Sequence, residues 1–228
     1  MNRWKASGLH FLISLVIFCV LLAIILLVWY PGLLFGLNGG WEGLRIVIGV
    51  DLVLGPLLTL IVFKVGKPSL KFDLTAIAAF QVLCLFGGVW VVYQERPVVL
   101  VFEFDSIYSL SAREYKGYGN SLDSLQGFAG RYPKKVYIEL PGGEVESLNY
   151  SVERQINDNP LYGDAQFYQA LPSDISDLVR DPVGVRLSAE AQIERTLAGD
   201  CLVAQFISSS KQGYVCLNPE SLVIKEFY

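Results

Sequence analysis

The side chains that most often perform catalysis are scarce in this chain. Its one histidine, His10, lies near the N-terminus beside a long apolar run, so no Ser–His or Cys–His pair can form in the more polar C-terminal part. The sequence contains no Cys-x-x-Cys or His-Glu-x-x-His spacing, no Gly-x-Ser-x-Gly motif, and no Walker-type or dinucleotide-binding loop. The chain has enough carboxylates to supply an Asp/Glu pair for glycoside hydrolysis, but no motif singles out a particular pair. We therefore expect a non-enzymatic protein with no cofactor and no metal.

The most informative polar residue lies inside an apolar run. Asp51 occurs in Gly49-Val-Asp-Leu-Val-Leu-Gly55-Pro56, and a carboxylate within a membrane span is costly unless it has a partner. Gln81, in the next apolar run, is a candidate hydrogen-bond partner by depth. Two interpretations remain open. Asp51 contacts another transmembrane helix, its own or a partner protein's, or it serves only the packing of neighbouring spans.

Small residues and a proline surround Asp51. Gly49 and Gly55 lack side chains and would let another helix approach closely, and Pro56 is expected to kink the helix. Together with Asp51 and Gln81, these residues form our hypothesis for a partner-contact site within the bilayer.

Three long apolar runs must position this site. We predict a transmembrane domain over residues 1–96, with spans at about 9–30, 43–63 and 73–94. The first run is too long for a signal peptide and lacks a small-x-small cleavage pattern, so we interpret it as an uncleaved anchor.

Charged and aromatic residues orient these spans. Lys and Arg precede the first run, and three lysines fill the short link between the second and third, whereas residues 30–43 contain no Lys or Arg at all. By the positive-inside rule the N-terminus is cytoplasmic, and everything after Tyr93 is periplasmic. The four tryptophans fall near predicted span ends: Trp4, Trp29, Trp41 and Trp90.

Residues 97–228 are predicted to form a membrane-proximal periplasmic α+β domain. This part carries eleven Lys and Arg against eighteen acidic residues, which argues against nucleic acid as a partner. We expect strands that form an antiparallel sheet at Val98–Phe104, Lys135–Leu140, Cys201–Ile207, Gly213–Leu217 and Leu222–Phe227. We expect helices from Pro160 to about Leu171, from Ser173 or Asp174, and at Ala189–Leu197.

The two cysteines of this domain are candidates for a disulfide. Cys201 and Cys216 flank a predicted hairpin, and an oxidising periplasm would permit a bridge. A turn centred on Ser210 pairs Cys216 closer to Ala204 than to Cys201, so the bridge requires a shifted register or a bulge. The alternative is two unpaired buried thiols.

Several motifs resemble a known family. The opening residues 1–10, Val28-Trp-Tyr-Pro31, the stretch 49–60 around Asp51, Gln81 and the exit Val92–Pro97 are similar to type IV pilin accessory proteins of the TfpX/TfpZ type. The resemblance covers residues 1 to about 105 and transfers no catalytic residues.

This resemblance implies a role in the type IV pilus pathway. It implies a multi-pass protein of the bacterial inner membrane that acts as an adaptor or chaperone and contacts the transmembrane helix of pilin. The globular head of pilin and other pilus assembly components are further candidate partners. The alternative is an auxiliary subunit of a periplasmic pilin-modifying enzyme, for example one that adds a glycan. A membrane sensor is disfavoured, because the predicted cytoplasmic parts are too short for a signalling module.

Overall fold

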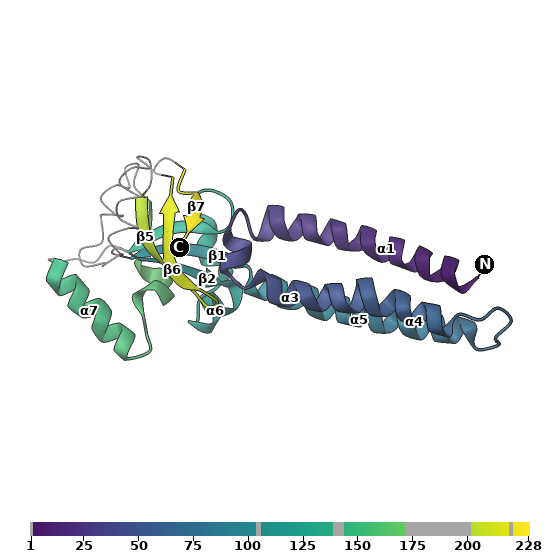
Figure 1. The fold of residues 1–228 in the computed structure, drawn as a ribbon. Coiled ribbons are helices and arrows are strands. Elements are labelled where there is room, and N and C mark those ends of the chain that lie inside the picture. The colour runs from purple at the N-terminus through teal and green to yellow at the C-terminus, as the bar shows by residue number, and fades with distance from the viewer. Residues whose placement is uncertain (1, 104–105, 139–143, 172–201, 219–220) are drawn as a thin grey trace. The chain divides into compact units, whose positions relative to one another are not determined.

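The computed structural model describes residues 2–103, 106–138, 144–171, 202–218 and 221–228 (Figure 1). The chain forms two compact units. The first consists of Met1–Pro31 and Gly39–Glu95, and the second of Gly32–Asn38 and Arg96–Tyr228. The chain therefore passes between the units three times, and a short piece of the N-terminal sequence belongs to the second unit.

Three long helices build the first unit. Helix α1 (Arg3–Ile24) continues as a π-helical turn η1 (Ile25–Trp29). The second long helix is composed of α3 (Gly40–Val47), the π-helical η2 (Ile48–Leu54) and α4 (Gly55–Val62), and the third is α5 (Leu70–Glu95). Each is long and apolar enough to cross a membrane, and successive helices run in opposite directions (Figure 1). The three predicted apolar helices are confirmed.

The side chains of these helices are arranged with apolar groups outside and polar groups inside. Leu27 and Leu83 are 77% and 72% exposed, whereas Ser14, Asp51 and Gln81 are buried. A helical bundle in water would show the opposite arrangement. Apolar surfaces facing outward and polar groups facing inward are what a hydrocarbon surrounding favours.

The π-helical segment η2 lies directly before Pro56. The N–H of Gly55 donates to the Val50 carbonyl, five residues back. Proline has no N–H, so the Leu52 carbonyl loses its ordinary α-helical donor, and a wider turn is one way to accommodate that loss. Asp51 lies in this widened segment.

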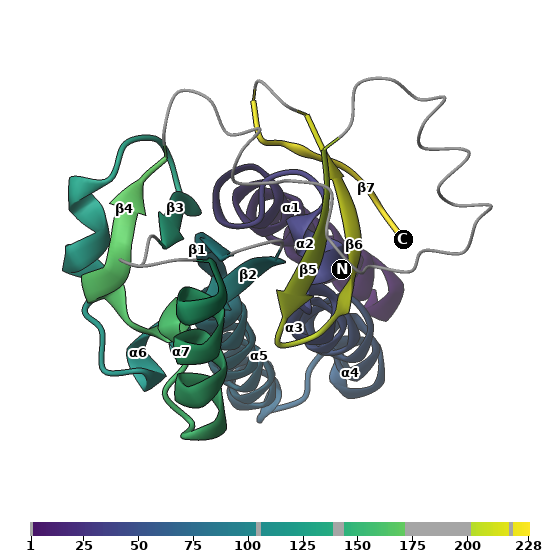
Figure 2. The ribbon, with the colours of Figure 1, turned by 90° about the vertical axis from the view of Figure 1, so that its left-hand side faces the viewer.

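The second unit is built on one seven-stranded sheet, with strand order β4-β3-β1-β2-β5-β6-β7 (Figure 2). Its strands are β1 (Pro97–Glu103), β2 (Ser106–Ser111), β3 (Lys134–Ile138), β4 (Tyr168–Ala170), β5 (Leu202–Ser208), β6 (Gln212–Leu217) and β7 (Ile224–Phe227). The prediction of an antiparallel sheet was wrong, because β1 pairs with β3 and β2 with β5 in parallel. Strands β2 and β4 and helices α6 (Ala112–Gly117) and α7 (Glu144–Ile156) were not predicted from the sequence, and β2 separates β1 from β5.

The two faces of the sheet carry separate hydrophobic clusters. Alternate residues of β1 point to opposite faces, so Leu100 and Phe102 join one cluster while Val99 and Val101 join the other. We call the first the α2-side cluster, because it includes Leu34 and Leu37 of the short helix α2 (Leu34–Leu37).

The link between the first two long helices is thus part of the sheet domain. Leu34 and Leu37 are 5% and 3% exposed within the α2-side cluster. The Asn38 side-chain amide donates to Ser109 Oγ over 2.9 Å, and Ser208 Oγ donates to the Leu37 carbonyl over 2.7 Å. Residues 32–38 and 96–228 therefore share one hydrophobic core.

Helices and 3-10 turns lie between the strands along the chain. They are α6 (Ala112–Gly117), the 3-10 turns η3 (Leu122–Gly127), η4 (Leu161–Gly163) and η5 (Ala165–Phe167), and helix α7 (Glu144–Ile156). The predicted helix from Pro160 to about Leu171 was wrong. Asp164 ends η4, and its side chain accepts from the Gln166 N–H to cap η5, so two separate turns lead into β4. The helices expected between 173 and 197 lie outside the described residues.

The β5–β6 hairpin has a register one residue away from the predicted one. Cys216 pairs with Val203, and its side chain is buried and disulfide-bonded. Cys201 lies outside the described residues, so its bridge to Cys216 stays a prediction.

We predict that α2 is required for the stability of the sheet domain. Leu37→Ala removes a buried side chain and should destabilise the protein by about 2–5 kcal/mol. Leu33→Ala is the matched control, since Leu33 is 44% exposed and should change stability little. Thermal unfolding of the detergent-solubilised full chain measures both. Equal stability of the two variants would contradict the role of α2 in the core.

Candidate functional site

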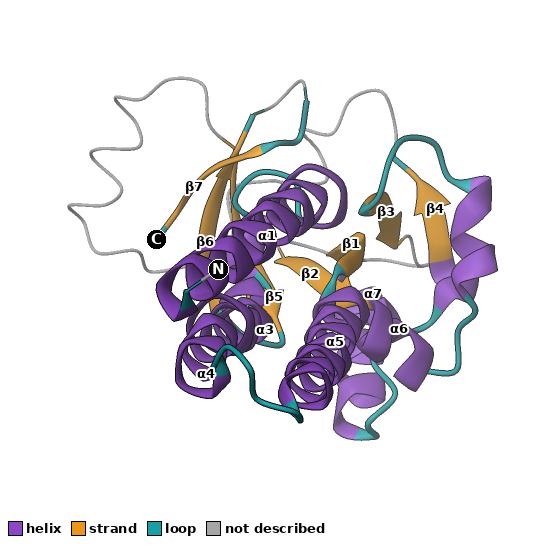
Figure 3. Ribbon diagram, turned by 90° about the vertical axis from the view of Figure 1, so that its right-hand side faces the viewer, coloured by secondary structure: helices purple, strands orange, loops and turns teal. Residues whose placement is uncertain are grey.

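Buried and half-buried polar side chains of the first unit form one cluster between the long helices. We call it the interhelical polar cluster and define it as Ser7, His10, Asp51, Thr59 and Gln81. Its members come from all three long helices, which Figure 3 views from the end where the chain begins.

The contacts between α1 and α4 are hydrogen bonds. Ser7 Oγ donates to the Pro56 carbonyl over 2.8 Å. His10 Nδ1 lies 2.6 Å from Thr59 Oγ1, and Thr59 is 3% exposed. The only histidine in the sequence is therefore engaged in a contact between helices.

Asp51 and Gln81 form the contact between η2 and α5. Both are buried, at 7% and 8% exposed, and the Gln81 side chain hydrogen-bonds the Asp51 carboxylate. Among the described residues, the second carboxylate oxygen, Oδ2, is buried with no hydrogen-bond partner. Gly55 makes this approach possible, because a Cβ at that position would overlap the Gln81 amide.

The structure brings together four of the five residues of the sequence-based hypothesis. Asp51, Gly55, Pro56 and Gln81 are buried beside one another, whereas Gly49 is exposed and a Cβ there would meet no atom within 4 Å. Gly49 faces away because it lies two residues before Asp51, roughly half a turn around the widened helix.

Sequence reasoning missed the contribution of α1. Ser7, His10 and Ser14 are spaced three and four residues apart, which places them on one face of the first span. That polar stripe in an otherwise apolar helix was the signal for an inward-facing surface. Close approach between α3 and α5 was also missed at Gly43, where a Cβ would overlap Val92.

The chemistry of the cluster is hydrogen bonding. No group of three or more His, Cys, Asp or Glu side chains that could hold a metal occurs among the described residues. The cluster can fix the relative positions of the helices, and Asp51 Oδ2 can accept one further hydrogen bond from a donor that reaches it.

Alanine substitutions at two glycines distinguish the effect of side-chain packing on stability from the effect of helix propensity. Gly55→Ala places a methyl group against Gln81 and should destabilise the helices by about 1–3 kcal/mol. Gly49→Ala adds the same methyl group in open space and should be neutral or slightly stabilising, since alanine favours helix. Thermal unfolding in detergent measures both. The packing of Asp51 and Gln81 is wrong if Gly55→Ala is as stable as Gly49→Ala.

Comparison with known proteins places these features in a family. Residues 1–32 match the family model of the fimbrial assembly protein FimB. The fimbrial assembly protein of serogroups C1 and C2 of Dichelobacter nodosus is 37% identical over 109 residues, which cover 47% of this chain and 83% of that protein. No solved structure gives a significant match.

A second relative is longer. The serogroup E1 fimbrial assembly protein of Dichelobacter nodosus is 30% identical over 152 residues, and the match covers 59% of this chain and 59% of that protein. The chain thus spans about three-fifths of the length of this relative but most of the C1 and C2 protein. The sequence resemblance to type IV pilin accessory proteins is confirmed, and the chain belongs to the fimbrial assembly protein family.

Proposed function

We propose that this chain is a non-enzymatic accessory protein of the bacterial inner membrane that binds type IV pilin and promotes its assembly into pili. The observation that carries the proposal is membership of a family whose relatives are named fimbrial assembly proteins. The apolar outer surface of the three long helices supports membrane anchoring. The buried contacts of the first unit are hydrogen bonds suited to holding helices together.

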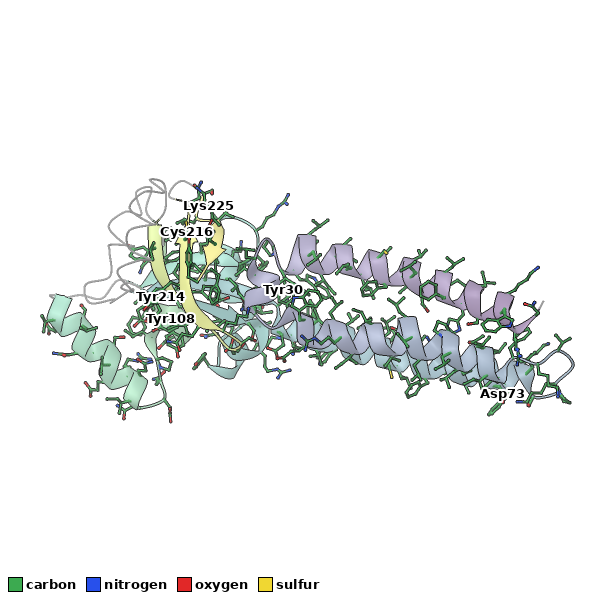
Figure 4. All side chains as sticks on the ribbon, in the orientation of Figure 1. Tyr30, Asp73, Tyr108, Tyr214, Cys216 and Lys225 are labelled. Atoms are coloured by element: carbon green, nitrogen blue, oxygen red, sulfur yellow. The ribbon has the colours of Figure 1, made fainter. Side chains whose placement is uncertain are left out.

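Two features support a topology with the N-terminus in the cytoplasm and the sheet domain in the periplasm. Asp73 pairs with Lys67 over 2.6 Å at the end of the first unit where the chain begins (Figures 1 and 4). Arg3, Lys5 and the lysines of residues 64–71 are therefore at the same end, as the positive-inside rule requires. Residues 32–38 share a core with residues 96–228, so both must lie on one side of a membrane.

The proposed contact with pilin involves Asp51. Its carboxylate uses Gln81 as an internal partner, and its Oδ2 has none among the described residues. An unpaired acceptor is costly in an apolar surrounding, so a donor from the pilin transmembrane helix would be stabilising there. In this proposal Asp51 serves both the packing of its own helices and the contact with a partner helix.

Substitution of Asp51 tests the proposal. Asp51→Leu removes the acceptor and should lower the amount of pilin co-purified and the number of surface pili per molecule of the chain. Asp51→Asn keeps hydrogen bonding and should be milder. Immunoblotting, pull-down and counting of pili measure these effects. A variant Asp51→Leu with wild-type piliation and abundance would remove Asp51 from the mechanism.

Pilin mass distinguishes the proposal from the alternative of a pilin-modifying subunit. Deletion of the gene should reduce the number of assembled pili and leave the mass of mature pilin unchanged. An altered pilin mass in the deletion strain, measured by intact mass spectrometry, would favour the alternative.

Reporter fusions test the topology. A reporter active only in the periplasm should function when fused after Arg96 and fail when fused at Gly66, because lysines flank Gly66. Fusion at Gly66 to a reporter active only in the cytoplasm is the reciprocal control. Equal activity of the periplasmic reporter at both sites would overturn the three-span arrangement.

A further inference from the structure

Helix α7 attaches to the sheet domain through its polar face. Ser147 is buried, and the Ser151 hydroxyl donates to Oε1 of Glu103, at the end of β1. Arg154 forms an ion pair with Asp164 over 3.0 Å and donates to the Asn159 carbonyl over 2.9 Å. The helix therefore turns serines and its only cation toward its own domain.

The opposite face of α7 is an exposed apolar stripe. We define the α7 stripe as Val145, Leu148, Val152 and Ile156, which are 73%, 49%, 47% and 77% exposed. Their spacing of three, four and four residues places them within about 80° of arc on one side of the helix. Figure 4 shows side chains of α7 reaching away from the sheet.

This orientation is the reverse of that expected for a helix on a globular domain. An amphipathic helix usually buries its apolar stripe and exposes its polar face. Here the polar face is anchored to a buried glutamate, 5% exposed, whose Oε2 has no hydrogen-bond partner in the described part of the chain. Burial raises the pKa of the Glu103 carboxyl, although hydrogen bonds from Ser151 and from the Tyr162 backbone lower it. Contiguous exposed apolar side chains mark interaction surfaces.

The charges beside the stripe limit what can cover it. Glu146 and Glu153 are exposed along one border of the stripe, while Arg154 is already paired with Asp164. The domain that carries α7 is acidic as a whole, with eighteen acidic against eleven basic residues in 97–228. A second copy of α7 would place carboxylates beside carboxylates, and anionic lipid would be repelled for the same reason. A protein surface that is apolar at its centre and basic at its border is complementary.

We propose that α7 is the docking helix for the pilin subunit, and that its stripe fits an apolar surface of the pilin head bordered by Lys or Arg. This rests on the proposed function and adds the contact surface on the sheet domain. A helix that presents anchors at i, i+3 and i+7 is a common mode of helix-in-groove recognition. The carboxylates of Glu146 and Glu153 would steer association and fix the orientation of the helix.

Paired substitutions of exposed residues test the surface. Leu148→Ser/Val152→Ser removes two anchors, and because both side chains are exposed the domain should fold as before. Val223→Ser is the matched control, since Val223 is a 53% exposed valine of the same domain outside α7. The full chain is tagged, extracted from membranes in detergent and tested for co-purified pilin, with its own abundance measured by immunoblot.

The stripe variant should retain less than about one-tenth of the pilin that wild type retains, at equal abundance, and Val223→Ser should match wild type. Glu146→Lys/Glu153→Lys should also reduce retained pilin, and more so at low salt. Full retention of pilin by the stripe variant would overturn the docking role of α7. A stripe variant that loses self-association but still retains pilin would also overturn it, because the stripe would then bind a second copy of the chain. The two proposals fail differently. If wild type retains no pilin and the deletion strain is normally piliated, the function itself is wrong.

Discussion

The hydrogen bonds of Asp51 and its neighbours constrain how the three long helices pack. Side chains on the outside of these helices are almost entirely apolar and carry no information about which faces should meet. Between the helices, in contrast, Gln81 reaches Asp51 past Gly55, and His10 contacts Thr59. Polar groups in an apolar surrounding are costly without partners, so an altered rotation of any one helix would lose these contacts. The widened helix before Pro56 places Asp51 within this set.

The second unit depends on a different constraint, which is the connection of distant parts of the chain in one core. Leu34 and Leu37 lie between two of the long helices in sequence, yet they are buried with strands from the C-terminal part. The domain cannot fold completely until that link is in place, and the link in turn ties the domain to both flanking helices. The same domain presents α7 with its serines inward and its apolar stripe outward. Polar contacts therefore have different effects in the two units. In the first unit they join long helices to one another, and in the second they hold α7 with its apolar face uncovered.

The sequence predicted the long helices well because a run of about twenty apolar residues has few other stable forms. It also identified Asp51, Gln81 and Gly55, whose types are unusual or permissive within such runs. Gly49, in contrast, does not lie beside Asp51, because residues that are close in sequence need not share one helix face; the partner-contact role of all five residues stays a prediction. The sheet was harder. Strand β2 separates β1 from β5, and parallel pairing over long sequence separations leaves no local pattern. Helix α7 was not among the predicted helices, and its orientation does not follow from its sequence, since amphipathicity shows that a helix has two faces but not which one meets the domain.

Direct contact with pilin is the central claim, and site-specific photocrosslinking in living cells tests it most directly. A photoreactive residue is introduced singly at Val152 and Ile156 on α7, along the second long helix around Asp51, and at Val223 as a control position. We expect adducts with pilin from α7 and from the second helix, and none from Val223. The absence of pilin adducts at every position on α7 and the second helix, in cells whose piliation depends on the protein, would contradict direct binding.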